Sequence, residues 1–203
     1  PRDAVELRKV GRVFLKVFAF TRASVVELRI FLEKFRRSAE IVEKEVAAAE
    51  KILKNVCDFV RIKGEFPELS SEPVREKKRV LREAQLVEII IQLLEVAYEE
   101  FERLSRVAPT NSEGLIDQAH GANSSNPSHS TYIALEARES VLNFIRLCYR
   151  VLQELSSDCP SNSLFASAWL DFLLDKAIRY PSTVDVGVAQ MLSHLIENKE
   201  RHL

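Results

Sequence analysis

Apolar residues recur at helical spacing along almost the whole chain, and this periodicity restricts the fold more than any other feature. They lie three and four positions apart, as in Val10, Val13, Phe14 and Val17, so each segment has one apolar face when it is helical. The sequence has no sustained period-two alternation of the kind that marks half-buried strands. Leu, Ala, Glu, Lys and Arg, which are good helix formers, dominate these segments. The sequence therefore predicts an all-α protein.

The residues between the apolar segments predict where the helices end. We expect helices at about 3–20, 23–62 with a break near 37–38, 74–106 with a break near 84–85, 132–156, 163–179 and 183–197. Short turns around Pro160 and Pro181 join consecutive helices, because proline ends a helix. Such pairs have armadillo-like proportions, although no clean sequence repeat is visible. We expect one domain over 1–203, an armadillo-like stack of antiparallel helices, with a flexible loop at about 109–130.

Composition excludes several classes of protein. With 46% hydrophobic residues and 5 Gly among 203 residues, the chain is neither collagen-like nor disordered in bulk. The net charge of -1 provides no global field for nucleic acid or an anionic membrane, and we expect contact with neither. Uncharged runs such as 161–170 are shorter than the roughly 20 apolar residues that a membrane span needs. The chain starts at Pro1 without a signal-peptide pattern, so we expect a fragment of a larger protein.

The three cysteines are an odd number without CxxC spacing, which argues against a disulfide framework and against zinc, and favours a reducing, cytosolic environment. Cys57 and Cys148 lie on apolar faces of predicted helices, where we expect them to be buried. Cys159 lies in a predicted turn, so we expect it to be exposed and to react with thiol reagents.

The sequence lacks the motifs of enzymes, such as a nucleophile elbow, a Walker loop or a zinc-protease helix. Of the four histidines, His120 and His129 lie in the predicted loop and His202 lies at the chain end, where no side chain is held rigidly against a substrate. We therefore expect no enzyme, no cofactor and no metal site.

A row of cations is the one unusual pattern in the chain. It consists of Arg75, Lys78, Arg79 and Arg82. Spacings of three and four place these residues on one side of a helix, where they repel one another unless an anion or an acidic partner lies against them. Glu76 and Glu83 lie beside the row and can neutralise part of it, so an exposed helix face with weak ion pairs is the alternative interpretation.

The same residues carry a family resemblance. Arg75–Glu83, followed by the apolar Ile89–Leu94, resembles the start of the helical ligand-binding core domain of inositol trisphosphate receptors. Ile145–Leu152 is similar to the Arg-Leu-Cys-Tyr-Arg-Val-Leu helix of that domain, and Leu192–Lys199 is more loosely similar to its closing helix. The matches follow the family's order over about two thirds of the chain. They resemble the RIH domain, an armadillo-like stack shared by ryanodine and inositol trisphosphate receptors.

The resemblance implies a cytosolic domain of a ligand-gated calcium-release channel at the membrane of an intracellular store, such as the endoplasmic reticulum. It implies that inositol 1,4,5-trisphosphate binds jointly to this domain and an upstream β-trefoil, with Arg75, Arg79, Arg82 and Lys77 in phosphate-binding positions. Neighbouring domains and subunits of a tetrameric channel are the other implied partners. In place of the family's Tyr-Arg-Lys run, which completes the phosphate cage, this chain has Cys159–Ser161.

Two alternatives remain open on the sequence. The first is a coupling module of a ryanodine-receptor-like channel that binds no ligand, in which the cations pair with acidic residues of a neighbouring domain. The second is an unrelated helical-repeat scaffold.

Overall fold

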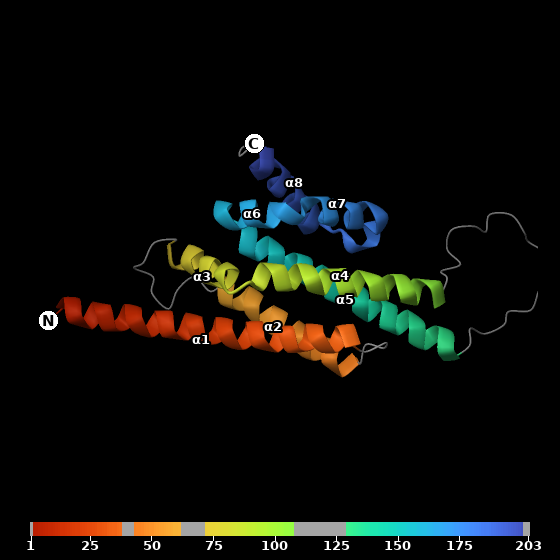
Figure 1. Cartoon of the computed structure of the whole chain (residues 1–203), viewed down its shortest axis with the longest axis horizontal. Helices are drawn as coiled ribbons and strands as arrows, with labels where there is room; N and C mark the ends of the chain where they lie inside the picture. Colours follow the sequence, from red (N-terminus) through yellow and green to blue (C-terminus); the bar gives the residue numbers. More distant parts are fainter. Residues whose placement is uncertain (1, 38–42, 62–71, 108–128, 201–203) are drawn as a thin grey trace, which may run out of the picture.

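The computed structural model describes residues 2–37, 43–61, 72–107 and 129–200 (Figure 1). In chain order its helices are α1 (Arg2–Arg37), α2 (Glu43–Arg61), α3 (Glu72–Glu83), α4 (Leu86–Val107), α5 (His129–Ser156), α6 (Pro160–Ala166), the 3-10 helix η1 (Ser167–Trp169), α7 (Leu170–Arg179), the 3-10 helix η2 (Pro181–Thr183) and α8 (Val186–Glu200). These described ranges contain no strand. The all-α prediction is confirmed.

The helices form an antiparallel stack around α4 and α5. These two run in opposite directions, since Tyr98 meets Tyr149 while Ser105 meets Arg138. α2 packs against α5, and α1 covers α2, α3 and α4 at one edge of the stack (Figure 1). The segment α6 to α8 lies on the opposite side, against α5. This arrangement agrees with the helical-repeat fold that the sequence predicts.

One apolar core runs through the stack. Its largest fully buried side chains include Leu28 of α1, Leu53 of α2, Ile90 of α4 and Ile145 of α5. Each lies on the helical face that the spacing of apolar residues predicts. In the described part of the chain, burial of this apolar surface stabilises the packing of the helices, and the three cysteines are free thiols.

Several helix boundaries differ from the prediction. α1 continues through Thr21 and Arg22, where we expected a break, because neither residue prevents helix propagation and Thr21 is buried. The predicted helix 163–179 begins at Pro160, which occupies the first turn, and is interrupted by η1. The predicted break near 84–85 is confirmed, with Gln85 in the left-handed region at φ 66°. The predicted loop 109–130 lies outside the described residues, apart from the first two residues of α5.

Candidate functional site

The cation-rich helix α3 lies between the carboxyl-terminal ends of α2 and α5. Leu81 anchors it in the core and is fully buried. The last carbonyl oxygens of an α-helix lack partners within that helix and carry partial negative charge, so cations bind there readily. The position of α3 therefore brings its cations to two helix ends.

The end of α5 receives two of these cations. Arg75 donates a hydrogen bond of 3.2 Å from Nε to the carbonyl oxygen of Asp158, and Lys78 Nζ donates to the carbonyl oxygen of Ser157. Lys78 is only 4% exposed, and this burial lowers the pKa of its ammonium group, while the nearby Asp158 carboxylate acts in the opposite direction. The prediction that Lys78 projects from the same side of the helix as Arg79 is wrong, because the turn after α5 covers Lys78 while Arg79 is exposed.

The end of α2 receives a third cation. Lys77 donates a hydrogen bond of 3.2 Å from Nζ to the carbonyl oxygen of Phe59, and the same nitrogen lies 4.8 Å from the centre of the Phe59 ring. The cation thus interacts with both the helix end and an aromatic face. Lys77 points away from Arg79 and toward α2.

The outer face of α3 carries Arg79 and Arg82. Arg79 donates a hydrogen bond of 2.9 Å from Nε to Glu83, and its Nη1 lies 3.9 Å from a carboxylate oxygen of Glu76. This hydrogen bond lowers the pKa of the Glu83 carboxyl group. Arg82 is more buried, with 21% of its side chain exposed and Nη2 3.8 Å from Glu83. The acidic neighbours that the sequence indicates beside the row therefore do pair with it.

The turn after α5 contributes no cation. Cys159 is buried, which corrects the prediction that it is exposed: α6 begins at the next residue and turns the thiol inward, where Sγ lies 3.6 Å from Ser161 Oγ. Asn162 is fully buried and donates from Nδ2 to the carbonyl oxygens of Lys78, at 3.1 Å, and Leu155, at 3.0 Å. The sequence offers no signal for this role, because it depends on three helices meeting.

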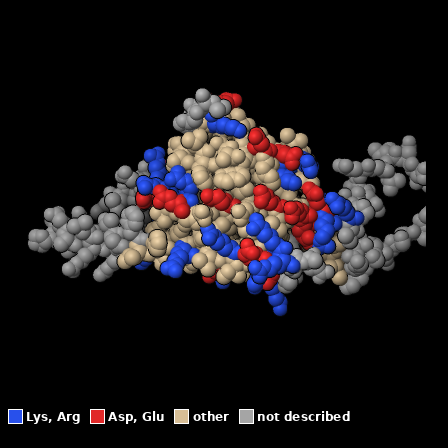
Figure 2. All heavy atoms as spheres, viewed as in Figure 1, with Lys and Arg blue, Asp and Glu red and all other residues tan. Residues whose placement is uncertain are grey.

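Of the four predicted phosphate-binding residues, Arg75 and Arg79 are exposed, Arg82 is half-buried beside Glu83, and Lys77 is directed to α2. Figure 2 shows basic and acidic side chains intermixed over the visible face of the molecule, not separated into one basic patch. A phosphate at α3 would meet two exposed guanidinium groups, each already in contact with a neighbour.

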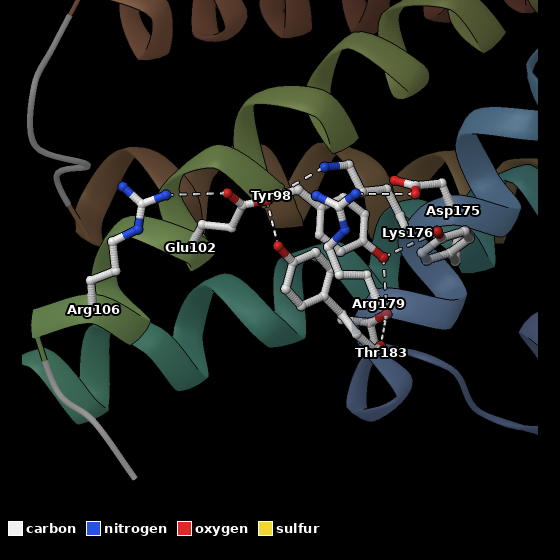
Figure 3. A network of polar contacts seen from close by, with 9 residues as sticks. Tyr98, Glu102, Arg106, Asp175, Lys176, Arg179 and Thr183 are labelled. Atoms are coloured by element: carbon white, nitrogen blue, oxygen red, sulfur yellow. Dashed lines mark hydrogen bonds and ion pairs between the residues drawn. The ribbon is translucent and has the colours of Figure 1, made fainter.

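A second polar cluster fixes α7 and η2 to α4 and α5 (Figure 3). The Tyr98 hydroxyl lies 3.1 Å from the Tyr149 hydroxyl and 2.9 Å from Thr183 Oγ1, and Tyr180 donates to Glu102. Burial, more than the hydrogen bond to Glu102, raises the pKa of Tyr180 to about 12. Because hydroxyl groups of α4, α5 and η2 satisfy one another here, we assign this cluster to packing of the stack.

The described ranges show neither a metal site nor a membrane span. They contain no group of three or more His, Cys, Asp or Glu side chains placed to hold a metal ion. None of their helices is both long enough and apolar enough to cross a membrane.

Comparison with known protein families gives one match. Residues 51–203, about three quarters of the chain, match the RIH domain found in ryanodine and inositol trisphosphate receptors. This match contains α3, the turn after α5 and the Tyr98 cluster. No curated protein and no solved structure matches the sequence. The all-α stack and the family match agree, and the chain belongs to the RIH domain family of these receptor channels.

Proposed function

We propose that this chain is an interdomain coupling module of an intracellular calcium-release channel, in which the exposed arginines of α3 contact acidic residues of a neighbouring domain. The observation that carries the proposal is the attachment of α3 to two other helices. Arg75 and Lys78 bind carbonyl oxygens after α5, and Lys77 binds a carbonyl oxygen near the end of α2. A displacement of α3 is therefore transmitted to both α2 and α5.

Burial makes this attachment stiff. Lys78 cannot turn outward without breaking its contact with Ser157 and uncovering the packed region around Asn162. Closely packed interiors transmit displacement instead of absorbing it. Arg79, with 57% of its side chain exposed, is the cation of α3 best placed to meet a carboxylate on another domain.

Binding of inositol trisphosphate, jointly with an upstream β-trefoil, is the second candidate function. It is favoured by the exposure of the contacts of Arg75 and Arg79, since solvent-exposed hydrogen bonds and ion pairs are weak and are readily exchanged for a phosphate. The turn of Cys159, Pro160 and Ser161 weighs against it, because this segment offers no positive charge to complete a cage around three phosphates. We therefore rank this candidate below coupling.

Membership of this receptor-channel family supports the same cellular location and the same partners for either function. We place the domain at the cytosolic face of an intracellular calcium-store membrane, with neighbouring domains and subunits of a tetrameric channel as its partners. The flanking domains would receive the movement of α3.

Charge reversal of Arg79 tests coupling. In a channel that contains this domain, we expect Arg79→Glu to reduce calcium release severalfold. Arg103→Glu is the matched control, because Arg103 on α4 is also half exposed and also pairs with a glutamate three residues away. Equal calcium release by the Arg79→Glu and wild-type channels would overturn the proposal, and equal losses in both variants would show only a general effect of charge.

A further inference from the structure

Helix α1 is apolar on two opposite faces. One face enters the core through Val25, Leu28 and Leu32, all buried. The opposite face carries Leu15, Val26 and Ile30, which are 71%, 47% and 52% exposed. A surface helix of a globular protein normally has a polar face toward water, and a helix that is apolar all round is normally buried. The outer stripe of α1 therefore has the character of a covered surface.

The stripe has a definite shape. Ala19 and Ala23 are exposed and occupy its middle, between Leu15 and Val26. Positions 15, 19, 23, 26 and 30 follow one another by three or four residues, so they form one row along the helix. Small side chains between large ones leave a notch in such a row, and a ridge of side chains on a second helix fits into a notch of this kind.

The charge around the stripe is positive. Residues 15–37 of α1 contain six Lys or Arg and two Glu, a net charge of +4, whereas the whole chain has a net charge of -1. Three of these cations have acidic partners in the fold, because Lys34 pairs with Glu45 of α2 and both Arg36 and Arg37 pair with Glu33. Arg22 lies beside Ala23, is exposed, and has no hydrogen bond or ion pair to another described residue. A partner with carboxylates along its edges complements this surface.

Two other occupants fit less well. A second copy of the chain would bring its own α1, with the same charge of +4, against the stripe, and like charges oppose that contact. An anionic membrane would be repelled by the carboxylate of Glu33, which follows Ile30 on the same face. Fluid lipid chains also need no notch at Ala19 and Ala23 to cover an apolar stripe.

We propose that the outer stripe of α1, formed by Leu15, Ala19, Ala23, Val26 and Ile30, is a docking surface for an amphipathic helix whose apolar face is flanked by Asp or Glu. The described part of α1 precedes residues 51–203, so this surface lies outside the RIH match and is independent of the proposal for α3. At the edge of the stack, α1 is accessible to such a helix from a neighbouring domain or protein (Figure 1).

Two synthetic helical peptides test this proposal on the 203-residue chain. Both have the same leucine face, and one is flanked by glutamate and the other by lysine. We expect the glutamate-flanked peptide to bind at least tenfold more tightly by fluorescence anisotropy. Ala23→Glu, which fills the notch with a charge, should weaken that binding at least tenfold. Arg22→Glu, a second variant with unaltered apolar residues, should remove the preference between the peptides.

The control variant is Ile178→Glu on α7, because Ile178 is 79% exposed and lies on another part of the molecule. It should leave peptide binding unchanged, and circular dichroism should report native helix content for all three variants. Equal affinity for both peptides, or no binding of either, would overturn the proposal. So would sedimentation of the chain with phosphatidylserine vesicles, or dimerisation of the chain, if Ala23→Glu abolished it.

Discussion

Asn162 Nδ2 donates a hydrogen bond of 3.1 Å to the backbone carbonyl oxygen of Lys78, across 84 residues of sequence. The same amide reaches the carbonyl oxygen of Leu155, near the end of α5. One fully buried side chain therefore links α3, α5 and α6. Since Lys78 Nζ also binds the turn after α5, the position of α3 depends on this small set of polar contacts.

Replacing Asn162 should release α3 from this junction. Asn162→Ala removes the two hydrogen bonds that Nδ2 donates, to the carbonyl oxygens of Lys78 and Leu155, and removes side-chain volume from a packed site. We expect the free energy of unfolding to fall by about 2–4 kcal/mol, measured by urea denaturation. The control, Asn143→Ala, removes an exposed amide and should change stability by less than about 0.5 kcal/mol. Equal effects of the two changes would contradict this role for Asn162.

Alkaline pH should destabilise the fold in part through Cys57. Burial, with a smaller contribution from the Glu154 carboxylate, raises the pKa of this thiol from its ordinary value of 9.0 to about 11. Because the folded state holds the proton more tightly, the resulting stability is fully present below pH 9.0 and is lost as pH rises through 11. Over that window the loss is about 3 kcal/mol. We expect Cys57→Ala to lose less stability than the wild type between these pH values, measured by urea denaturation, and parallel curves would contradict the assignment.

The three thiols should be unreactive in the folded protein. Cys57, Cys148 and Cys159 are all buried, so a thiol reagent reaches them only after local or global opening. With Ellman's reagent we expect almost no release of thionitrobenzoate in native buffer and stoichiometric release in denaturant. Rapid modification of one thiol in native buffer, assigned to Cys159 by peptide mapping, would contradict its burial.

Glycine should be better than alanine at the junction of α3 and α4. Gln85 has φ 66°, in the left-handed region, where a side chain costs roughly 1 kcal/mol relative to glycine. Both Gln85→Gly and Gln85→Ala lose the hydrogen bond from Arg29, so their comparison isolates the backbone effect. We expect the glycine variant to be more stable by about 1 kcal/mol in thermal or urea unfolding. If the alanine variant were as stable as the glycine variant or more stable, the claim that the backbone at Gln85 is strained would be wrong.

Local patterns were sufficient to predict the fold class. The spacing of apolar residues predicts the buried faces of α1, α2, α4 and α5, because each amphipathic face needs only its own segment. The interruption of the predicted helix 163–179 at η1 was not predicted. It depends on local contacts such as the hydrogen bond of 2.7 Å that Ser167 Oγ donates to the carbonyl oxygen of Leu164. Nothing in the residue types alone distinguishes that stretch from continuous helix.

The placement of the α3 cations was predicted only in part, and their role in phosphate binding stays a prediction. The spacing of Arg75, Arg79 and Arg82 predicts one face of a helix; Arg75 and Arg79 are exposed on α3, whereas Arg82 is half-buried. The burial of Lys78 could not be predicted, because it follows from the end of α5, which lies about eighty residues later in the chain, meeting α3. For the same reason, burial of Cys159 depends on the contacts of the turn with α3 and α6.

Calorimetric titration of inositol 1,4,5-trisphosphate tests the coupling proposal most directly. The titrated protein should be this chain extended at its amino-terminal side by the β-trefoil that the family resemblance implies, beside its Arg79→Gln variant. We predict no heat of binding above dilution in either protein, as expected for a coupling domain whose cations bind other helices and a neighbouring domain. Tight binding to the unmodified protein that Arg79→Gln abolishes would contradict this account and make the chain part of a ligand-binding core.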